Sequence, residues 1–306
     1  MTRAVLVTGG AGFIGRHLVA ALVARGDRVT VMDNLFRGDR PTVPAEARFL
    51  EADIRDVAAL AEVLAGHELV YHLAAQSNVM GAVQDSDYSF TTNVLGTLNV
   101  VREAGRAGVR RVVFSSSREV YGEPGRLPVD ESALIFPKNA YGASKAAGEA
   151  YLSAAGTFGV AEAVALRFAN VYGPGDRDRV IPRWVEAAAN GEPLTVYGGE
   201  QVIDFVHVKV AVSALLAAAA CAPGLVANVG SGQGTPILEL ARRVVAASTS
   251  RASVEIAPAR GPEVVRFVAD VGRMRAELGV QPPADPLEHL EALVREARRP
   301  KAALTR

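Results

Sequence analysis

The stretch Thr8-Gly9-Gly10-Ala11-Gly12-Phe13-Ile14-Gly15 decides the fold of this chain. It follows a short β-branched run, Ala4–Thr8, and precedes a helical pattern that continues through Ala24. Glycines at such a strand-to-helix turn allow tight turning, close backbone approach to a pyrophosphate and close packing of helix on strand. The free N–H groups at the helix start would bind the phosphates. The stretch therefore predicts a dinucleotide-binding turn, whereas a glycine turn without a nucleotide is the alternative.

The second strand indicates which dinucleotide is bound. Arg28–Met32 reads as a strand, and Asp33 stands at its tip. A carboxylate there suits a hydrogen bond to a ribose 2′-hydroxyl and repels a 2′-phosphate, which favours NAD over NADP. Arg37, four residues later, argues the other way, but Asp33 carries more weight. The predicted cofactor is NAD.

Strand and helix patterns then alternate along the first two thirds of the chain, which is typical of βαβ crossovers and a parallel sheet. Further strands are expected at 48–50, 69–73, 111–116, 162–168 and 225–229, and helices at 57–64, 85–107 and 141–158. The predicted fold class is α/β, a Rossmann-type doubly wound parallel sheet of about seven strands. Ligands bind such sheets beyond the carboxyl ends of the strands, where Asp53, Ala74, Ser117 and Asn170 would lie.

The rhythm changes after Asn170, which suggests a second, smaller mixed α/β domain that binds substrate. Helices are expected at 182–190, 237–247 and 286–299, short strands at 194–197 and 254–256, and a strand followed by a helix within 205–222. We expect residues 1–170 to form the NAD-binding domain, with 201–231 returning to it. Residues 171–200 and 232–306 would form the smaller domain.

Bulk composition excludes several classes of function. The 306 residues carry 33 basic and 33 acidic side chains, so no global field would attract nucleic acid or an anionic membrane. The one cysteine, Cys221, permits no internal disulfide. We see no signal peptide, and the longest apolar run, 210–222, is too short to span a bilayer. A cytoplasmic protein without a metal site is expected.

A second motif, Tyr141-Gly142-Ala143-Ser144-Lys145, supplies candidate chemistry. Residues four apart on a helix share a face. An ammonium beside a phenol favours the phenolate, so Lys145 is expected to lower the pKa of Tyr141 and make it a general base. Ser117, at the tip of the fifth strand, is positioned to share the same substrate oxygen, and Ser116 is the alternative serine. The motif alone is weak, because long helices produce it by chance.

These motifs together resemble the extended short-chain dehydrogenase/reductases, in particular the NAD-dependent sugar-nucleotide epimerases and dehydratases. Leu73-Ala-Ala-Gln76, Asn93, Ser115-Ser-Ser117, Val120-Tyr-Gly122 and Arg167-Phe-Ala-Asn-Val-Tyr-Gly-Pro174 stand at the family's spacing, as does Asp204-Phe-Val-His-Val208. The resemblance implies that Tyr141 takes the proton of a sugar 4-hydroxyl while C4 gives a hydride to NAD. It also implies that Ser117 hydrogen-bonds the same oxygen and Lys145 holds the nicotinamide ribose.

The resemblance further implies two sets of binding residues. Those expected to contact NAD are Gly9, Gly12, Phe13, Ile14, Gly15, Asp33, Asn34, Arg37, Asp53, Ile54, Leu73, Ala74, Ala75, Gln76, Asn93, Ser115, Tyr141, Lys145, Phe168 and Val171. Those expected to contact a UDP-sugar are Ser117, Arg118, Glu119, Tyr141, Asn170, Arg177, Arg179, Val180, Thr195, Tyr197, Arg260 and Glu263. A homodimer built from the Asn93 and Tyr141 helices is also implied.

Four positions bear on the reaction. In related 4,6-dehydratases an Asp-Glu pair follows the hydroxyl residue, but here Arg118 replaces the aspartate, which disfavours water elimination. Glu119 is also compatible with a UDP-glucuronate decarboxylase, a structural cap or an ion pair. Arg177 and Arg179 are compatible with a sugar carboxylate, a phosphate contact or a solvated loop. We expect 4-epimerisation of UDP-glucose/UDP-galactose or of UDP-glucuronate/UDP-galacturonate. Decarboxylation, dehydration, net reduction and a non-catalytic nucleotide-binding protein are the alternatives.

Overall fold

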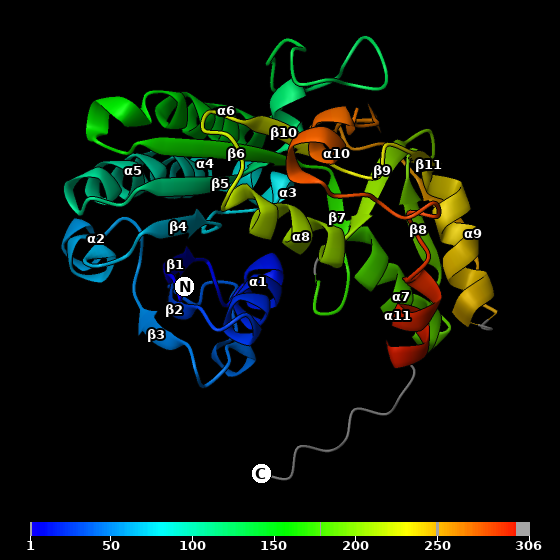
Figure 1. Ribbon diagram of the computed structural model, residues 1–306. Coiled ribbons are helices and arrows are strands. Elements are labelled where there is room, and N and C mark those ends of the chain that lie inside the picture. The colour runs from blue at the N-terminus through cyan, green and yellow to red at the C-terminus, as the bar shows by residue number, and fades with distance from the viewer. Residues whose placement is uncertain (1, 178, 249–250, 298–306) are drawn as a thin grey trace.

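The computed structural model describes residues 2–177, 179–248 and 251–297. A parallel sheet of seven strands forms the larger part of the molecule (Figure 1). Its order is β10-β6-β5-β4-β1-β2-β3. The strands are β1 (Ala4–Thr8), β2 (Arg28–Asp33), β3 (Arg48–Glu51), β4 (Leu69–His72), β5 (Arg111–Ser117), β6 (Glu162–Phe168) and β10 (Val226–Val229). The predicted fold class is confirmed.

Helices cover both faces of this sheet because successive side chains of each strand point to opposite sides. Val5 and Val7 of β1 belong to one core cluster, whereas Leu6 belongs to another. The first face is covered by α1 (Phe13–Ala24) and α8 (Val208–Ala218), which pack on each other. The second is covered by α2 (Val57–Leu64), α5 (Gly96–Arg106) and α6 (Ala140–Ser153).

The register of the sheet aligns the strand tips. Thr8, the last residue of β1, pairs with Met32 of β2 and with His72 of β4. The turns that follow these strands therefore meet at one edge. Gly9 has a φ of +72°, and a Cβ there would lie 2.6 Å from the backbone nitrogen of Ala74, so only glycine fits this close approach.

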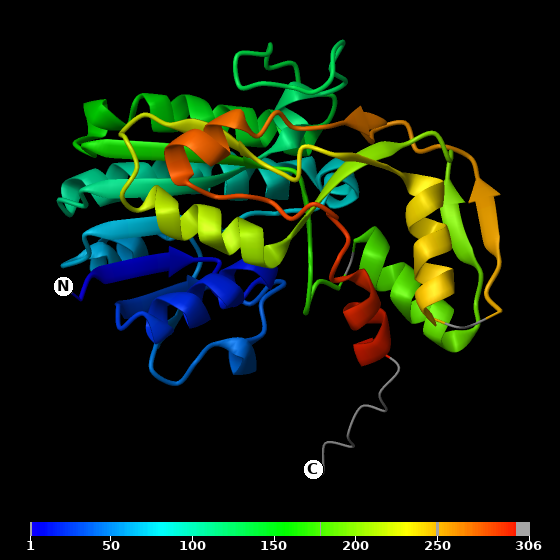
Figure 2. The same ribbon diagram turned by 45° about the vertical axis from the view of Figure 1, so that its right-hand side comes forward.

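The smaller part of the molecule contains two further sheets (Figure 2). In one, β9 (Val202–His207) pairs with β7 (Asn170–Tyr172), β11 (Gly234–Pro236) and β13 (Arg266–Phe267). In the other, β8 (Leu194–Tyr197) pairs with β12 (Val254–Ala257). A separate core cluster joins β7, β8 and β9 to α7 (Val180–Asn190), α9 (Ile237–Ser248) and α11 (Leu290–Ala297).

Several elements differ from expectation. The helix expected over 85–107 is divided into α4 (Ser86–Ser89), a π-helical turn (Phe90–Leu95) and α5, preceded by α3 (Val79–Gln84). Asn93 in the π-helical turn faces inward and bonds to Gln76 and Ser144, which accounts for the local change of winding. The helix expected over 141–158 ends at Ser153, and a 3₁₀ turn covers Ala155–Phe158.

The region around residue 170 also differs. No strand was expected there, but Asn170–Tyr172 forms β7, which pairs with Phe205–His207 of β9. Of residues 201–231, β10 joins the large sheet and α8 packs against its first face, whereas β9 pairs in the smaller sheet. The division into two domains with these boundaries remains a proposal. Helix α10 (Gly272–Leu278) was not anticipated.

Two expectations concern the end of the chain and membranes. The last helix was expected over 286–299, and residues 298–299 of that range lie outside the described part, as does the 298–306 end of the proposed smaller domain. Within the described ranges, no helix is both long and apolar enough to cross a bilayer.

Candidate active site

A cavity of about 1260 Å³ opens at the carboxyl ends of the large sheet's strands. It runs from the glycine turn after β1 past the tips of β4 and β5 to α7 and β8 of the smaller part. All but two of the residues expected to contact NAD or substrate line it; Asp53 and Asn93 do not. The sequence motifs therefore converge on one site.

The cofactor half of the cavity begins at the N-terminus of α1, where the N-cap residue is Gly12. A Cβ on Gly12 would meet only the Gly9 carbonyl, at 3.2 Å, and would otherwise occupy the cavity. Unlike Gly12, Gly15 is packed tightly, because its Cβ would lie 2.1 Å from the same oxygen. This arrangement leaves a cradle for a diphosphate at the helix start. The residues present thus fit a dinucleotide.

Asp33 is buried at the tip of β2 and is held by the backbone. Its Oδ2 accepts from the Ala11 N–H at 3.0 Å, and its Oδ1 accepts from the Leu35 N–H at 2.9 Å. Burial raises the pKa of this carboxyl, and the two backbone N–H groups oppose that rise. The carboxylate is thereby fixed at the cavity wall, where a ribose hydroxyl can donate to it.

The two expected cofactor residues outside the cavity wall act on their neighbours. Asp53 accepts from Asn34 at 2.8 Å and from Arg55, which holds the pKa of Asp53 down at about 2. Asn93 lies beneath the wall, where its Oδ1 accepts from the Gln76 N–H at 2.7 Å and its amide donates to the Gln76 carbonyl at 3.0 Å. Both residues therefore position wall residues in this structure.

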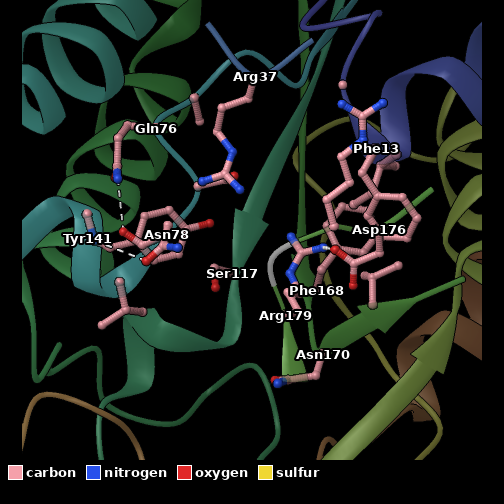
Figure 3. A pocket seen from close by; sticks show the side chains of 18 of the residues that line it. Phe13, Arg37, Gln76, Asn78, Ser117, Tyr141, Phe168, Asn170, Asp176 and Arg179 are labelled. Atoms are coloured by element: carbon pink, nitrogen blue, oxygen red, sulfur yellow. Dashed lines mark hydrogen bonds and ion pairs between the residues drawn. The ribbon is translucent and has the colours of Figure 1, made fainter. Parts of the chain in front are cut away.

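The catalytic candidates come from two adjacent elements. Ser117 ends β5, and Tyr141 and Lys145 lie in the first turns of α6. Helix α6 begins where Asn139 Oδ1 caps the Gly142 N–H at 2.8 Å. The helix lies close against the turn that follows β5, since a Cβ on Gly142 would be 2.3 Å from the Glu119 carbonyl oxygen. Figure 3 shows Ser117 and Tyr141 facing the same space.

The pKa of Tyr141 differs from the expectation that Lys145 would lower it. Burial raises the pKa of Tyr141 to about 12, while Arg179 and a hydrogen bond with Ser117 act in the opposite direction. Burial also lowers the pKa of Lys145 to about 7. The Lys145 ammonium lies 5.9 Å from the centroid of the Tyr141 ring and donates to the Ser115 carbonyl at 2.8 Å. Burial thus outweighs the expected effect of Lys145 on the pKa of Tyr141.

The alternative serine has a different partner. The Ser116 hydroxyl donates to the buried Glu149 carboxylate. Glu149 also accepts a hydrogen bond from Arg167, whose Nη2 donates at 2.7 Å. Ser116 thus belongs to a buried ion-pair network one helical turn beyond Lys145. The Ser117 hydroxyl instead accepts from the Glu119 N–H at 3.2 Å and hydrogen-bonds Tyr141.

Arg118 and Glu119 form a buried pair beside Ser117. Arg118 Nη2 lies 2.9 Å from Glu119 Oε1, and Arg118 Nε donates to Asn170 Oδ1 at 2.6 Å. The other oxygen of Glu119 accepts from the Asn139 amide at 2.8 Å. Both carboxylate oxygens of Glu119 are therefore occupied.

The remaining arginines of the site are paired as well. Arg177 lies 2.9 Å from Asp39, and 62% of its side chain is exposed. Arg179 lies 3.2 Å from Asp176, as seen in Figure 3. Arg260 stacks on the Tyr197 ring with its guanidinium carbon 3.5 Å from the ring centroid. Glu263 lies 3.6 Å from Arg260, and Thr195 and Val180 complete this wall.

Sequence reasoning missed several residues of the cavity wall. Asn78 lines the cavity, and its backbone carbonyl accepts from the Gln76 amide at 3.0 Å (Figure 3). Asp176 is nearly covered at the junction of the two halves. Further lining residues are Arg16, Met80, Thr92, Arg183 and Trp184. Only Asn78 carried a usable signal, since it stands two residues after a predicted strand-tip residue.

Comparisons with known proteins agree with this geometry. Residues 5–230 match the NAD dependent epimerase/dehydratase family. A putative UDP-glucose 4-epimerase of Methanocaldococcus jannaschii is 35% identical over 297 residues, which cover 95% of this chain and 97% of that protein. The structure of the UDP-glucose 4-epimerase of Thermotoga maritima with UDP-glucose has a TM-score of 0.92 and 32% identity, and covers 96% of this chain and 98% of that one.

A third likeness is to MoeE5, solved in complex with UDP-glucuronic acid and NAD. It has a TM-score of 0.89 and 33% identity, and the match covers 97% of this chain and 99% of that one. The predicted cofactor, NAD, is confirmed by the family and by this relative. The glycine turn, the buried Asp33, the Ser117–Tyr141–Lys145 group and these full-length similarities lead to one conclusion: the chain is an enzyme of the NAD-dependent epimerase/dehydratase family.

Proposed function

We propose that the enzyme catalyses the 4-epimerisation of a UDP-sugar, either UDP-glucose/UDP-galactose or UDP-glucuronate/UDP-galacturonate. The observation that carries the proposal is the placement of Ser117, Tyr141 and Lys145 on the wall of one cavity, beside the glycine cradle. Such an arrangement suits oxidation of a hydroxyl, because it pairs a proton acceptor with a site for a hydride acceptor.

In the proposed reaction Tyr141 takes the proton of the sugar 4-hydroxyl, and Ser117 hydrogen-bonds the same oxygen. Lys145 stabilises the phenolate by its charge. Its ammonium is held in place because it donates to the Ser115 carbonyl. The glycine cradle and Asp33 would hold NAD, which would supply the hydride acceptor and donor for C4. Inversion requires the 4-keto sugar to turn over in the site before the hydride returns. Tyr141 then gives back the proton, so the net change is inversion at C4.

Binding of the UDP moiety is assigned to the smaller part of the molecule. Arg260 and Tyr197 form a stacked pair at the cavity wall, and Asn170 stands at the start of β7. An arginine can donate two parallel hydrogen bonds to a phosphate. We assign a further diphosphate contact to Arg177 or Arg179, which line the same cavity.

The occupied state of Glu119 weighs against dehydration, one of the alternative reactions. Water elimination calls for a free acid–base group beside the sugar, whereas both oxygens of Glu119 are held by Arg118 and Asn139. The decarboxylase and the 4,6-dehydratase/reductase remain the second candidates. A non-catalytic nucleotide-binding protein is the distant alternative, which the presence of Ser117, Tyr141 and Lys145 disfavours.

We further infer a homodimer formed through the helices that carry Asn93 and Tyr141. Val83, Phe90 and Leu95 lie in the Asn93 segment or just before it. Each of these apolar side chains is exposed, and 59% of Phe90 is accessible. Exposed apolar side chains gathered on neighbouring helices are typical of an interface. Analytical ultracentrifugation should find a dimer for the wild type and a monomer for Phe90→Asp; a monomeric wild type would refute this assembly.

One experiment tests the proposed reaction. The purified enzyme is incubated separately with UDP-glucose, UDP-galactose and UDP-glucuronate, and the products are identified by NMR. A C4 epimer is the expected product. Release of CO2, or accumulation of a keto sugar, would replace the proposal with one of its alternatives.

A further inference from the structure

A chain of buried polar side chains connects the cofactor side of the cavity to the catalytic helix. Its members come from β1, β4, α5, the π-helical turn and α6, and they are Thr8, His72, Thr97, Asn93 and Ser144. None of them is more than 5% exposed. Burying a polar group costs free energy unless it is hydrogen-bonded, and a fully bonded chain makes the elements that it connects rigid.

His72 stands at the centre of this chain. Its Nδ1 lies 2.8 Å from Thr8 Oγ1, and its Nε2 lies 2.9 Å from Thr97 Oγ1. The centroid of its ring lies 5.5 Å from that of Phe114, and the Lys145 ammonium lies 4.8 Å from the centroid of the Phe114 ring. His72 therefore contacts the residue before the glycine turn and also the ring beneath Lys145.

The direction of each hydrogen bond follows from the donors that are available. Thr97 Oγ1 lies 2.6 Å from the Asn93 carbonyl oxygen, which can only accept, so the one hydroxyl hydrogen of Thr97 points there. Thr97 must then accept from His72, which places a proton on Nε2. Burial, and after it the charge of Lys145, lower the pKa of His72 to about 3, so the ring is neutral at pH 7. Its Nδ1 is therefore an acceptor, and Thr8 donates to it.

Both ends of the chain reach groups of the active site. At one end Thr8 Oγ1 accepts from the N–H of Ala74, which lines the cavity, at 3.3 Å. At the other end the Asn93 amide donates to Ser144 Oγ at 2.9 Å. The Ser144 hydroxyl in turn donates to the carbonyl of Tyr141 at 2.8 Å. The chain thus joins the cofactor side of the cavity wall to the backbone of the catalytic tyrosine.

We propose that His72, as the neutral tautomer with its proton on Nε2, is a positioning residue that fixes the cofactor side of the cavity relative to the Tyr141 helix. The inference rests on the proposed oxidation at C4, which requires a hydride acceptor and Tyr141 to meet the same carbon. His72 does not line the cavity, so it acts through Thr8 and Thr97. A displacement of about 1 Å between reacting groups can cost about 100-fold in rate.

The test uses two variants that break the chain and one matched control, all as holoenzymes. His72→Phe keeps a ring of similar size and removes both hydrogen bonds, and Thr97→Val removes the hydroxyl with little change of shape. The control is His67→Phe, because His67 Nε2 also bonds a threonine, Thr30 Oγ1 at 3.0 Å. Neither His67 nor Thr30 lines the cavity.

Steady-state rates with the UDP-sugar that the wild type epimerises show whether positioning is lost. His72→Phe and Thr97→Val should each lower kcat by about 10- to 100-fold and change KM less than about threefold. The double variant should be little slower than either single variant, because both substitutions interrupt one chain. His67→Phe should keep the wild-type kcat. A rise in KM as large as the fall in kcat, or a wild-type kcat in both chain variants, would overturn the inference.

Two further measurements do not depend on turnover. Nitrogen NMR of histidine-labelled wild type at pH 7 should show His72 protonated on Nε2, and a proton on Nδ1 would contradict the chain. Hydrogen–deuterium exchange in His72→Phe should become faster in Phe90–Leu95 and in the first turns of α6, with no change there in His67→Phe. Faster exchange confined to β4 would show that His72 only packs locally. If His72→Phe does not fold, Thr97→Val and the tautomer decide the outcome.

The same data distinguish failure of the inference from failure of the proposed function. If the wild type epimerises a UDP-sugar and the chain variants are as fast, the inference fails and the epimerase assignment stands. If the wild type epimerises no UDP-sugar, the proposed function fails, and the tautomer and the exchange pattern still decide whether His72 connects the two sides of the site.

Discussion

Replacing Lys145 by methionine should make the stability of the protein respond differently to pH. Lys145 is almost fully buried, and burial lowers the pKa of its ammonium from 10.5 to about 7, while Glu149 acts in the opposite direction. Methionine has a similar length and carries no charge, so Lys145→Met removes the cost of burying the charge at every pH.

The sign follows from proton binding in the two states. Below pH 7 the folded wild type carries the buried ammonium at full cost. Between pH 7 and 10.5 the unfolded chain still binds the proton and the folded protein does not, so the stability of the wild type rises with pH. A shift of one pKa unit corresponds to about 1.4 kcal/mol. The stability advantage of Lys145→Met over the wild type should therefore shrink by about 3 kcal/mol from pH 6 to pH 9.

The assay is urea unfolding of nucleotide-free protein at pH 6, 7, 8 and 9, for the wild type, Lys145→Met and Lys209→Met. Lys209 is exposed at the start of α8, so its replacement should give a curve parallel to that of the wild type. A difference between Lys145→Met and the wild type that stays constant, or that grows as the pH rises, would refute the reasoning.

Three further predictions concern the site. Gly15→Ala should abolish NAD binding, measured by release of the nucleotide on denaturation, because its Cβ would lie 2.1 Å from the Gly9 carbonyl; nucleotide retained at wild-type level would show that the turn can yield. Tyr141→Phe should abolish turnover, measured by NMR, with NAD still bound, and surviving activity would remove Tyr141 as the base. Glu149→Ala should destabilise the fold by about 3–5 kcal/mol in urea unfolding, because it leaves the charge of Arg167 buried without its partner; a loss below 1 kcal/mol would contradict this.

The sequence predicted the large sheet well because each of its strands is a local signal. Helix α2 has the predicted bounds Val57–Leu64, and β6 has the predicted bounds Glu162–Phe168. The glycine turn was recognisable because its backbone passes so close to that of Ala74 that only glycine fits at Gly9, and this requirement is visible in the sequence. The cavity position followed from parallel strands ending at one edge.

The parts that escaped prediction depend on contacts between distant segments. The π-helical turn at Phe90–Leu95 accompanies the bonds of Asn93 to Gln76 and Ser144, which no local pattern encodes. Strand β13 has only two residues and exists through pairing with β9. Residue spacing predicted that Tyr141 and Lys145 share a helix face, but the opposing pKa shifts of the two residues arise from burial, which spacing does not reveal.

The central claim is that C4 of the sugar loses and regains a hydride within one site. It is tested by epimerising the UDP-sugar in D2O and observing C4 of the product by proton NMR. The account predicts that C4 of the epimer still carries protium, because the transferred hydrogen never exchanges with solvent. Deuterium at C4 would show that the hydrogen leaves as a proton, and it would contradict the assignment of Tyr141 and NAD to the oxidation.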